Sequence, residues 1–190
     1  MQASTSAASC RFPLIDPATA TDPTVRATYG EIERELGFGM VPNIFRSLGS
    51  QPLVLEGTWR LFRAVVLHGT LPRIVKELIG TAVSSANRSP YALAVHMHSL
   101  GVQGVDKHIM AMVAEDRLDD IDLAPSVVAL LRIASQSARL GPATITDADL
   151  HDLREQDLTM EEIQEAFAAI NLFQYVNSLT DLARVPVDAL

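Results

Sequence analysis

Residues 71–99 read LPRIVKELIGTAVSSANRSPYALAVHMHS, and this stretch contains strong helix signals. Pro72 and the pair Ser89-Pro90 each mark a helix start, because proline is favoured at the first helical position and serine just before it. Gly101 supplies the stop signal that follows. The stretch therefore predicts two consecutive helices, one from Pro72 to about residue 87 and one from Pro90 to Gly101.

Helical signals also cover the rest of the chain. Further helix starts are marked by Pro23, Pro42, Pro52 and Pro125. A threonine followed three residues later by an acid gives a capping-box pattern at 146–149 and again at 159–162, ahead of a long final helix over 160–184. No alternating apolar and polar stretch of convincing length predicts a strand. We therefore expect an all-α protein of about eight helices.

The composition is that of a folded protein with an acidic balance. Of 190 residues, 48% are apolar and 20% are charged, which fits one domain with its own core. The formal net charge is −8 and no Lys/Arg-rich run occurs, so we expect no nucleic-acid partner. An acidic chain has little attraction for anionic lipid, and no apolar run reaches the roughly 18 residues of a spanning helix. Because no signal-peptide pattern is present either, we expect a cytoplasmic protein without a membrane partner.

The first residues differ in composition from the rest. Residues 1–21 are small and polar and contain Pro13 and Pro17, so we expect an extended N-terminal arm that lies over a neighbouring subunit. One helical domain over 22–190 is expected to follow. Cys10, in the arm, is the sole cysteine of the chain. A lone thiol forms no intrachain disulfide, no dithiol redox couple and no cysteine-based metal cluster.

Polar side chains gather on the first of the two central helices. Glu77 shares a helix face with Thr81, Ser84 and Ser85, because residues four, seven and eight apart lie on one side of a helix. A polar strip on an otherwise apolar helix indicates a wet cavity or a subunit boundary. Glu77 is the ionisable residue of this strip.

His96 is the corresponding ionisable residue on the second helix. It shares a stripe with Ala92 and Ser99, and Ser89 lies at the N-terminal end of that stripe. His98 is two residues further on and points to nearly the opposite side. The His-Met-His sequence is therefore a poor metal clamp, which requires histidines four residues apart.

Structural roles are alternatives for each of these candidates. A serine before a proline is an ordinary helix N-cap, which would account for Ser89. Glu77 is also interpretable as an exposed carboxylate paired with Arg73, four residues earlier. His96, on a mostly apolar helix, is also interpretable as a packed core histidine.

The spacing of the candidates resembles that of a known redox superfamily. Glu77 is followed by eleven residues, then by Ser89 and Ala92 at C-x-x-C spacing, and His96 follows after three more. Peroxidase members of the alkylhydroperoxidase D-like (AhpD-like) and carboxymuconolactone decarboxylase superfamily carry a glutamate, two cysteines and a histidine at this spacing. The resemblance extends over residues 40–184. It includes VPNIF at 41–45 and LFQYVNSLTDLARV at 172–185, which resemble the peroxidase-related subgroup.

The resemblance implies a fold and an assembly. The fold would be an AhpD-like helical bundle. Members assemble from identical subunits, so we expect a homo-oligomer, as a trimer or hexamer or else a dimer.

The resemblance also implies a chemistry, from which this chain departs. Peroxide reduction requires a thiolate and a resolving thiol, and neither Ser89 nor Ala92 supplies one, so we expect no thiol peroxidase activity. The decarboxylase branch acts without a cofactor. By analogy, we expect a cofactor-independent lyase, decarboxylase or isomerase for a small carbonyl- or carboxylate-bearing metabolite.

The residues receive roles in this hypothesis. Glu77 would be the general base, with a pKa raised by burial, and His96 the acid or oxyanion partner. Ser89, Tyr91 and Ser85 would bind the substrate through their hydroxyl groups. No metal or cofactor is expected.

Two other hypotheses stay open at this stage. One is a catalytically dead AhpD-like protein that binds a small molecule or serves in assembly. The other is a metal site that combines Glu77 and His96 with a histidine of another subunit, since the chain brings together too few ligands by itself.

Overall fold

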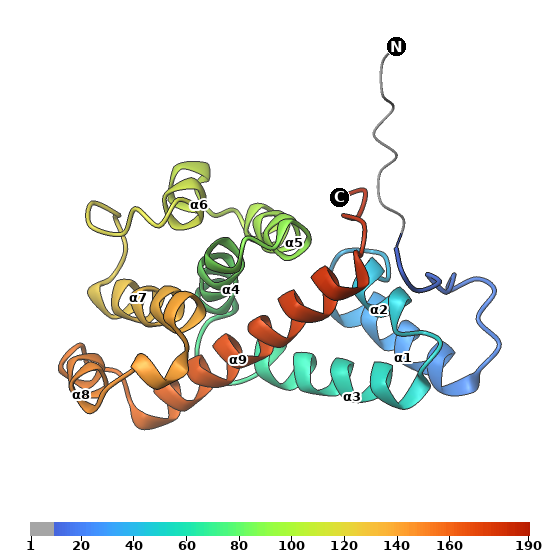
Figure 1. Cartoon of the computed structure of the whole chain (residues 1–190), viewed down its shortest axis with the longest axis horizontal. Helices are drawn as coiled ribbons and strands as arrows, with labels where there is room; N and C mark the ends of the chain where they lie inside the picture. Colours follow the sequence, from blue (N-terminus) through green and yellow to red (C-terminus); the bar gives the residue numbers. More distant parts are fainter. Residues whose placement is uncertain (1–9) are drawn as a thin grey trace, which may run out of the picture.

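Helix α4 (Arg73–Asn87) lies at the centre of the computed structural model, which describes residues 10–190 (Figure 1). It packs against α5 (Pro90–Val102), α6 (Lys107–Ala114), α7 (Pro125–Leu140) and α9 (Met160–Ala183). Every residue from 76 to 84 is buried. The polar strip predicted on this helix therefore lies inside the protein, where each polar group requires a partner.

The remaining elements surround this centre. They are α1 (Pro23–Glu35), α2 (Asn43–Ser47), α3 (Pro52–Phe62) with the π-helical turn η1 (Arg63–Leu67), the 3₁₀ turn η2 (Pro142–Thr144) and α8 (Asp147–Glu155). Residues 10–190 thus contain nine α-helices and no strand, which confirms the all-α prediction with one more helix than expected. None of the helices described is long and apolar enough to cross a membrane.

Local sequence signals explain most helix starts. Proline occupies the first turn of α1, α3, α5 and α7, where its missing N–H costs nothing. Asp22 caps α1 by accepting hydrogen bonds from the backbone of Thr24 and Val25. Both predicted capping boxes form, at the starts of α8 and α9. These signals act over one turn, so they mark the helix boundaries without any contribution from distant residues.

An aromatic cluster fills the space between α1, α2 and α3. Trp59 is fully buried, stacks on Phe62 with ring centroids 6.2 Å apart, and meets Phe45 edge-on at 5.7 Å. Its indole N–H donates to Glu31 Oε2 at 2.9 Å, which satisfies its polar atom. The cluster therefore fixes the relative positions of these three helices.

A buried ion pair between Lys76 of α4 and Glu165 of α9 joins these two helices and the turn before α4. Lys76 is 1% exposed, and its Nζ contacts Glu165 of α9 and the carbonyl of His68. Glu165 also accepts the backbone N–H of Thr70 at 2.7 Å. Gly69 has φ +109°, and a Cβ there would collide with the Glu165 carboxylate. The turn therefore needs a glycine at this position.

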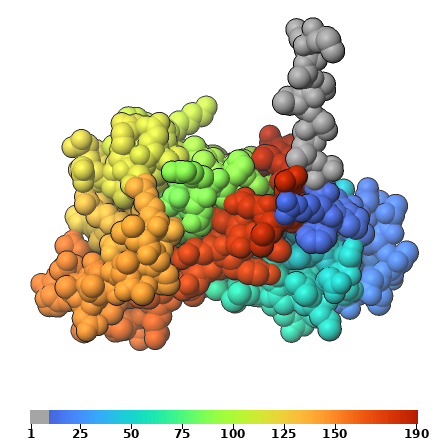
Figure 2. Space-filling model, in the orientation of Figure 1, coloured from blue at the N-terminus to red at the C-terminus, as the bar shows by residue number. Residues whose placement is uncertain are grey.

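Both ends of the described chain are fastened to the bundle. The Arg11 N–H donates to Ala183 O at 2.8 Å, so this part of the arm lies along its own chain (Figure 2). Asp188 is buried near the C-terminus, and its Oδ1 accepts the N–H of Asn43 at 2.8 Å. Residues 1–9 of the predicted arm lie outside the described residues.

Candidate active site

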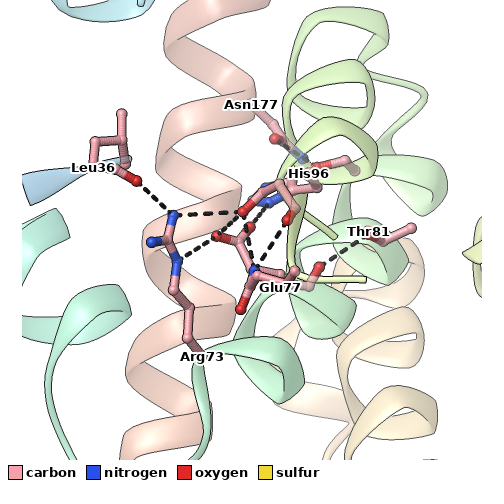
Figure 3. Close-up of polar contacts among 9 residues, drawn as sticks. Leu36, Arg73, Glu77, Thr81, His96 and Asn177 are labelled. Atoms are coloured by element: carbon pink, nitrogen blue, oxygen red, sulfur yellow. Dashed lines mark hydrogen bonds and ion pairs between the residues drawn. The ribbon is translucent and has the colours of Figure 1, made fainter. Parts of the chain in front are cut away.

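Glu77 of α4 and His96 of α5 meet in the interior of the bundle. His96 Nδ1 lies 2.8 Å from Glu77 Oε2, a hydrogen-bond distance (Figure 3). The two residues are 2% and 4% exposed. The structure thus brings together the pair that the resemblance to the superfamily motif suggested.

Gly80 makes this close approach possible. A Cβ built on Gly80 would lie 2.4 Å from His96 Cε1, closer than any tolerated contact. On another side, the imidazole meets the ring of Phe173 of α9 edge-on, with centroids 4.6 Å apart. The imidazole is therefore held between the backbone of α4 and an aromatic ring of α9.

The other carboxylate oxygen of Glu77 is also occupied. Oε1 accepts the Ser99 hydroxyl at 2.7 Å and the Arg73 Nε–H at 3.3 Å. Arg73 reaches further and donates from Nη2 to Leu36 O at 3.1 Å. The pairing with Arg73 considered from the sequence does form, but around a buried carboxylate instead of an exposed one.

These partners determine the ionisation of Glu77. Burial alone raises the pKa of its carboxyl, but the hydrogen bond and charge of His96, with Ser99 and Arg73, outweigh burial and hold the pKa below its ordinary value. The expectation that burial leaves this pKa raised is therefore wrong. Glu77 is a carboxylate at neutral pH and accepts the Nδ1 proton of His96, which leaves Nε2 as the free ring nitrogen among the described contacts.

A small apolar cavity lies beside the pair. Its volume is about 30 Å³, room for roughly two water molecules, because one needs about 10–15 Å³. Glu77, His96 and Tyr91 are the polar residues of its lining, and the rest are apolar side chains from the segment 36–45 and from α3, α5 and α9. Ala92, at the second cysteine position of the superfamily, also lines it.

Tyr91 lines the cavity, but its hydroxyl is already engaged. It donates to Asp188 Oδ2 at 2.7 Å and accepts the Ile44 N–H at 3.0 Å. Burial, together with the charge and hydrogen bond of Asp188, raises the pKa of Tyr91. Tyr91 therefore fastens the C-terminal segment to α2 and α5.

The two predicted serines lie elsewhere. Ser89 occupies the N-cap position of α5, yet its Oγ donates to Asp181 Oδ1 at 2.8 Å and not to the helix backbone. Ser85 Oγ donates to Ala114 O. Neither serine is among the residues that line the cavity. A role in substrate binding for Ser85, Ser89 or Tyr91 stays a prediction.

Two residues of the site were not identified from the sequence. Ser99 shares the helical stripe of His96, so its position was a usable signal. Gly80 also carried a signal, because an isolated glycine inside a helix costs stability and is commonly kept for a packing reason. Nowhere in residues 10–190 do three His, Cys, Asp or Glu side chains gather in a way that would hold a metal ion.

The fold is AhpD-like, and the two positions that correspond in spacing to the cysteines of that superfamily hold Ser89 and Ala92. Residues 52–136 match the carboxymuconolactone decarboxylase family, and the resemblance to this superfamily inferred from the sequence is confirmed.

Solved structures share the fold over nearly the whole chain. The AhpD core of a peroxidase-related protein from Ralstonia eutropha JMP134 is 24% identical, with a TM-score of 0.84 over 95% of this chain and 93% of that one. A peroxidase-related protein from Silicibacter sp. TM1040 is 20% identical, with a TM-score of 0.79 over 95% and 92%. Identities this low establish the fold alone.

A third structure carries a ligand. A cysteine-to-alanine variant of the debrominase Bmp8, in complex with 2,3,4-tribromopyrrole, is 20% identical, with a TM-score of 0.78 over 96% of this chain and 93% of that one. No curated protein sequence matches the chain at a significant level.

Proposed function

We propose that this protein is a cofactor-independent acid–base enzyme, of the lyase, decarboxylase or isomerase type, for a small carbonyl-bearing metabolite. The observation that carries this proposal is the 2.8 Å pair of Glu77 and His96 beside an apolar cavity. A buried carboxylate–imidazole pair at a cavity is the arrangement that enzymes use to move protons. The debrominase with the same fold, which binds 2,3,4-tribromopyrrole, supports a small-molecule enzyme.

The two residues have different tasks in this proposal. Glu77 is ionised and accepts the Nδ1 proton, so it orients His96 and stabilises the imidazolium form. His96 Nε2 removes a proton from the carbon next to a substrate carbonyl. In an isomerase the imidazolium then returns this proton at another carbon. In a decarboxylase no proton is removed first: CO₂ leaves with its bonding electrons left on the carbon, and His96 in its imidazolium form donates one proton there.

This assignment reverses the roles expected from the sequence. Glu77 was expected to be the base, but both of its oxygens accept hydrogen bonds and its pKa is lowered, which makes it a weak proton acceptor. His96 has a free ring nitrogen and borders the cavity.

Proton exchange provides a test that does not require the natural substrate. Small ketones and lactones incubated in D₂O with the protein should exchange their α-carbon protons, followed by ¹H NMR. Glu77→Gln or His96→Ala should lower the exchange rate by about 10²–10⁴-fold. His151→Ala and Glu155→Gln are matched controls, because this exposed pair on α8 is 3.9 Å apart and remote from the cavity. Equal rates in wild type and both site variants contradict the proposal.

Thiol chemistry is expected to be absent. Ser89 and Ala92 provide no sulfur, and Cys10 is near the end of α9, where its Sγ lies 3.4 Å from Ala183 O. A peroxide-consumption assay with dithiothreitol should show the same rate with and without the protein. Turnover that disappears in Cys10→Ser would contradict this expectation.

A second candidate is a binding or assembly protein without catalysis. The cavity of about 30 Å³ and the full set of partners around Glu77 favour it, since both are compatible with a site that only stabilises the fold. In that case Glu77→Gln and His96→Ala change stability and leave no activity to lose.

A further inference from the structure

The lining of the cavity limits the charge of its ligand. Glu77 is the anionic group of the lining, and no lysine or arginine is among the residues described there. The Arg73 guanidinium contacts Glu77 but does not line the cavity. A ligand carboxylate would lie near Glu77 and would have only His96, already hydrogen-bonded to Glu77, as a partner. Burying a charge without a partner is costly, so the lining selects against anions.

The same lining favours a flat ring. Four phenylalanines border the cavity, namely Phe38, Phe45, Phe62 and Phe173. Aromatic side chains pack well against the face or edge of another ring. A planar, conjugated molecule therefore matches both the shape and the chemistry of these walls.

The cavity is too small for a ring as it stands, so one wall has to move. Among the residues of the lining, Phe38, Phe62 and Val95 are partly exposed. Phe62 belongs to α3 and Val95 to α5, whereas Phe38 lies in the irregular segment 36–41 that links α1 to α2. Of these three residues, Phe38 is the one whose backbone can move without unwinding a helix.

The backbone on both sides of Phe38 suits such a movement. Gly37 and Gly39 have φ values of +87° and +67°, and neither has an atom within 4 Å of its Cβ position. Glycine crosses between regions of φ and ψ that other residues rarely adopt. The start of the segment is fixed, because Arg73 donates to Leu36 O, and the Phe38 ring rests edge-on against His98 with centroids 5.1 Å apart.

We propose that the cavity binds an uncharged, flat ring compound, such as a conjugated cyclic carbonyl or an aromatic amide, and that displacement of Phe38 admits it. The proposal names the substrate class of the proposed function and rests on it for the site. It narrows the proposed function to isomerases and to lyases other than decarboxylases, because the substrate of a decarboxylase carries a free carboxylate.

Ligand-detected ¹⁹F NMR tests the ligand class with a matched pair of probes. 4-Fluorobenzamide and 4-fluorobenzoate share a ring and nearly a size but differ in charge. We expect the amide to bind, and the benzoate to bind at least about tenfold more weakly, because its charge loses hydration in the cavity. Glu77→Gln should reduce the difference in affinity between the amide and the benzoate. Benzoate binding as tight as the amide, or no binding of the amide, overturns the proposal.

A cavity-filling variant shows where the probe binds. Ala92→Phe should abolish amide binding, whereas Ala168→Phe, on the exposed face of α9, should leave it unchanged. Ala92→Leu is the milder replacement if the larger side chain prevents folding. Amide binding that persists in a folded Ala92 variant would contradict the assignment of the binding site to this cavity.

The movement of Phe38 is tested by rates. Phe38→Ala should raise the association rate of the amide at least about tenfold, since entry would no longer wait for the side chain. Phe12→Ala is the control, because Phe12 is 53% exposed and does not line the cavity. An unchanged rate in Phe38→Ala overturns the role of Phe38.

Binding and turnover separate the two proposals. Amide binding without α-proton exchange would leave the ligand class standing and contradict the enzyme. Exchange without amide binding would support the enzyme and overturn the ligand class.

Discussion

At the residue scale, the central feature is the set of contacts around one buried carboxylate. Glu77 accepts hydrogen bonds from His96, Ser99 and Arg73, which come from two helices. A buried charge is tolerated only when it is paired and hydrogen-bonded, and here both oxygens are. The pair is therefore stable enough to hold an imidazole in one orientation.

Gly80→Ala tests how closely His96 depends on the backbone of α4. The new Cβ would overlap the imidazole, so the ring must shift and the hydrogen bond to Glu77 must lengthen or break. We expect a loss of about 1–3 kcal/mol in the free energy of unfolding, measured by urea denaturation. Gly57→Ala is the control, because Gly57 lies exposed in α3 with open space around its Cβ position. That change should be neutral or stabilising by up to about 1 kcal/mol. Equal effects at the two glycines would contradict the prediction.

The lowered pKa of Glu77 predicts a pH dependence of stability. The unfolded chain binds a proton at the ordinary pKa of 4.5, whereas the folded protein binds it only at lower pH. Stability from Glu77 is therefore complete above about pH 4.5 and is lost as the pH falls through the folded-state pKa. Urea unfolding at about pH 7 and about pH 3.5 should show a smaller loss in Glu77→Gln than in wild type. An equal loss in both proteins would mean that other carboxylates account for the dependence.

At the element scale, the sequence predicted helices well and their partners poorly. Proline positions and capping boxes located the starts of α1, α3, α5, α7, α8 and α9 because these signals are local. The helix from Pro52 was expected to continue to His68-Gly69, and the change to a π-helical turn after Phe62 was not predicted. Glu77 and His96 were paired from their spacing, but Asp188, which holds Tyr91, is 97 residues away and its contact depends on the whole fold.

The buried ion pair between α4 and α9 is an element-scale prediction. Lys76→Met leaves Glu165 without its cation and should cost about 3 kcal/mol in the free energy of unfolding. Arg60→Met is the control, because Arg60 pairs with Glu56 at 2.7 Å on the exposed surface of α3. Its loss should stay below about 1 kcal/mol. Thermal and urea unfolding of both variants provide the measurement, and similar losses would contradict a special role for Lys76.

At the scale of the whole molecule, α3 and α9 both carry large apolar side chains that are exposed. Leu61 of α3 is 50% exposed, and Tyr175 and Leu182 of α9 are 41% and 65% exposed. Thr58 Oγ1 of α3 and Tyr175 Oη of α9 are hydrogen-bonded, 3.1 Å apart. Exposed apolar patches on a folded protein are commonly sites of association.

We therefore expect the predicted homo-oligomer to bury Leu61 and Leu182 in its subunit interface. Leu61→Lys or Leu182→Lys is expected to lower the mass observed by sedimentation velocity, because a lysine in an apolar interface loses its hydration. Leu140→Lys, at the exposed end of α7, should leave the mass unchanged. A wild-type protein that sediments as a monomer at high concentration would contradict the prediction.

The aromatic cluster under the cavity has a practical consequence for spectroscopy. Trp59 is the sole tryptophan, so fluorescence excited at the long-wavelength edge of tryptophan absorption comes from this residue. Its indole touches Phe45 and Phe62, whose side chains also border the cavity. A molecule that enters the cavity therefore displaces water or shifts the rings of Phe45 and Phe62, which contact Trp59. A change in the emission wavelength or lifetime of Trp59 should therefore report binding in the cavity without any added label.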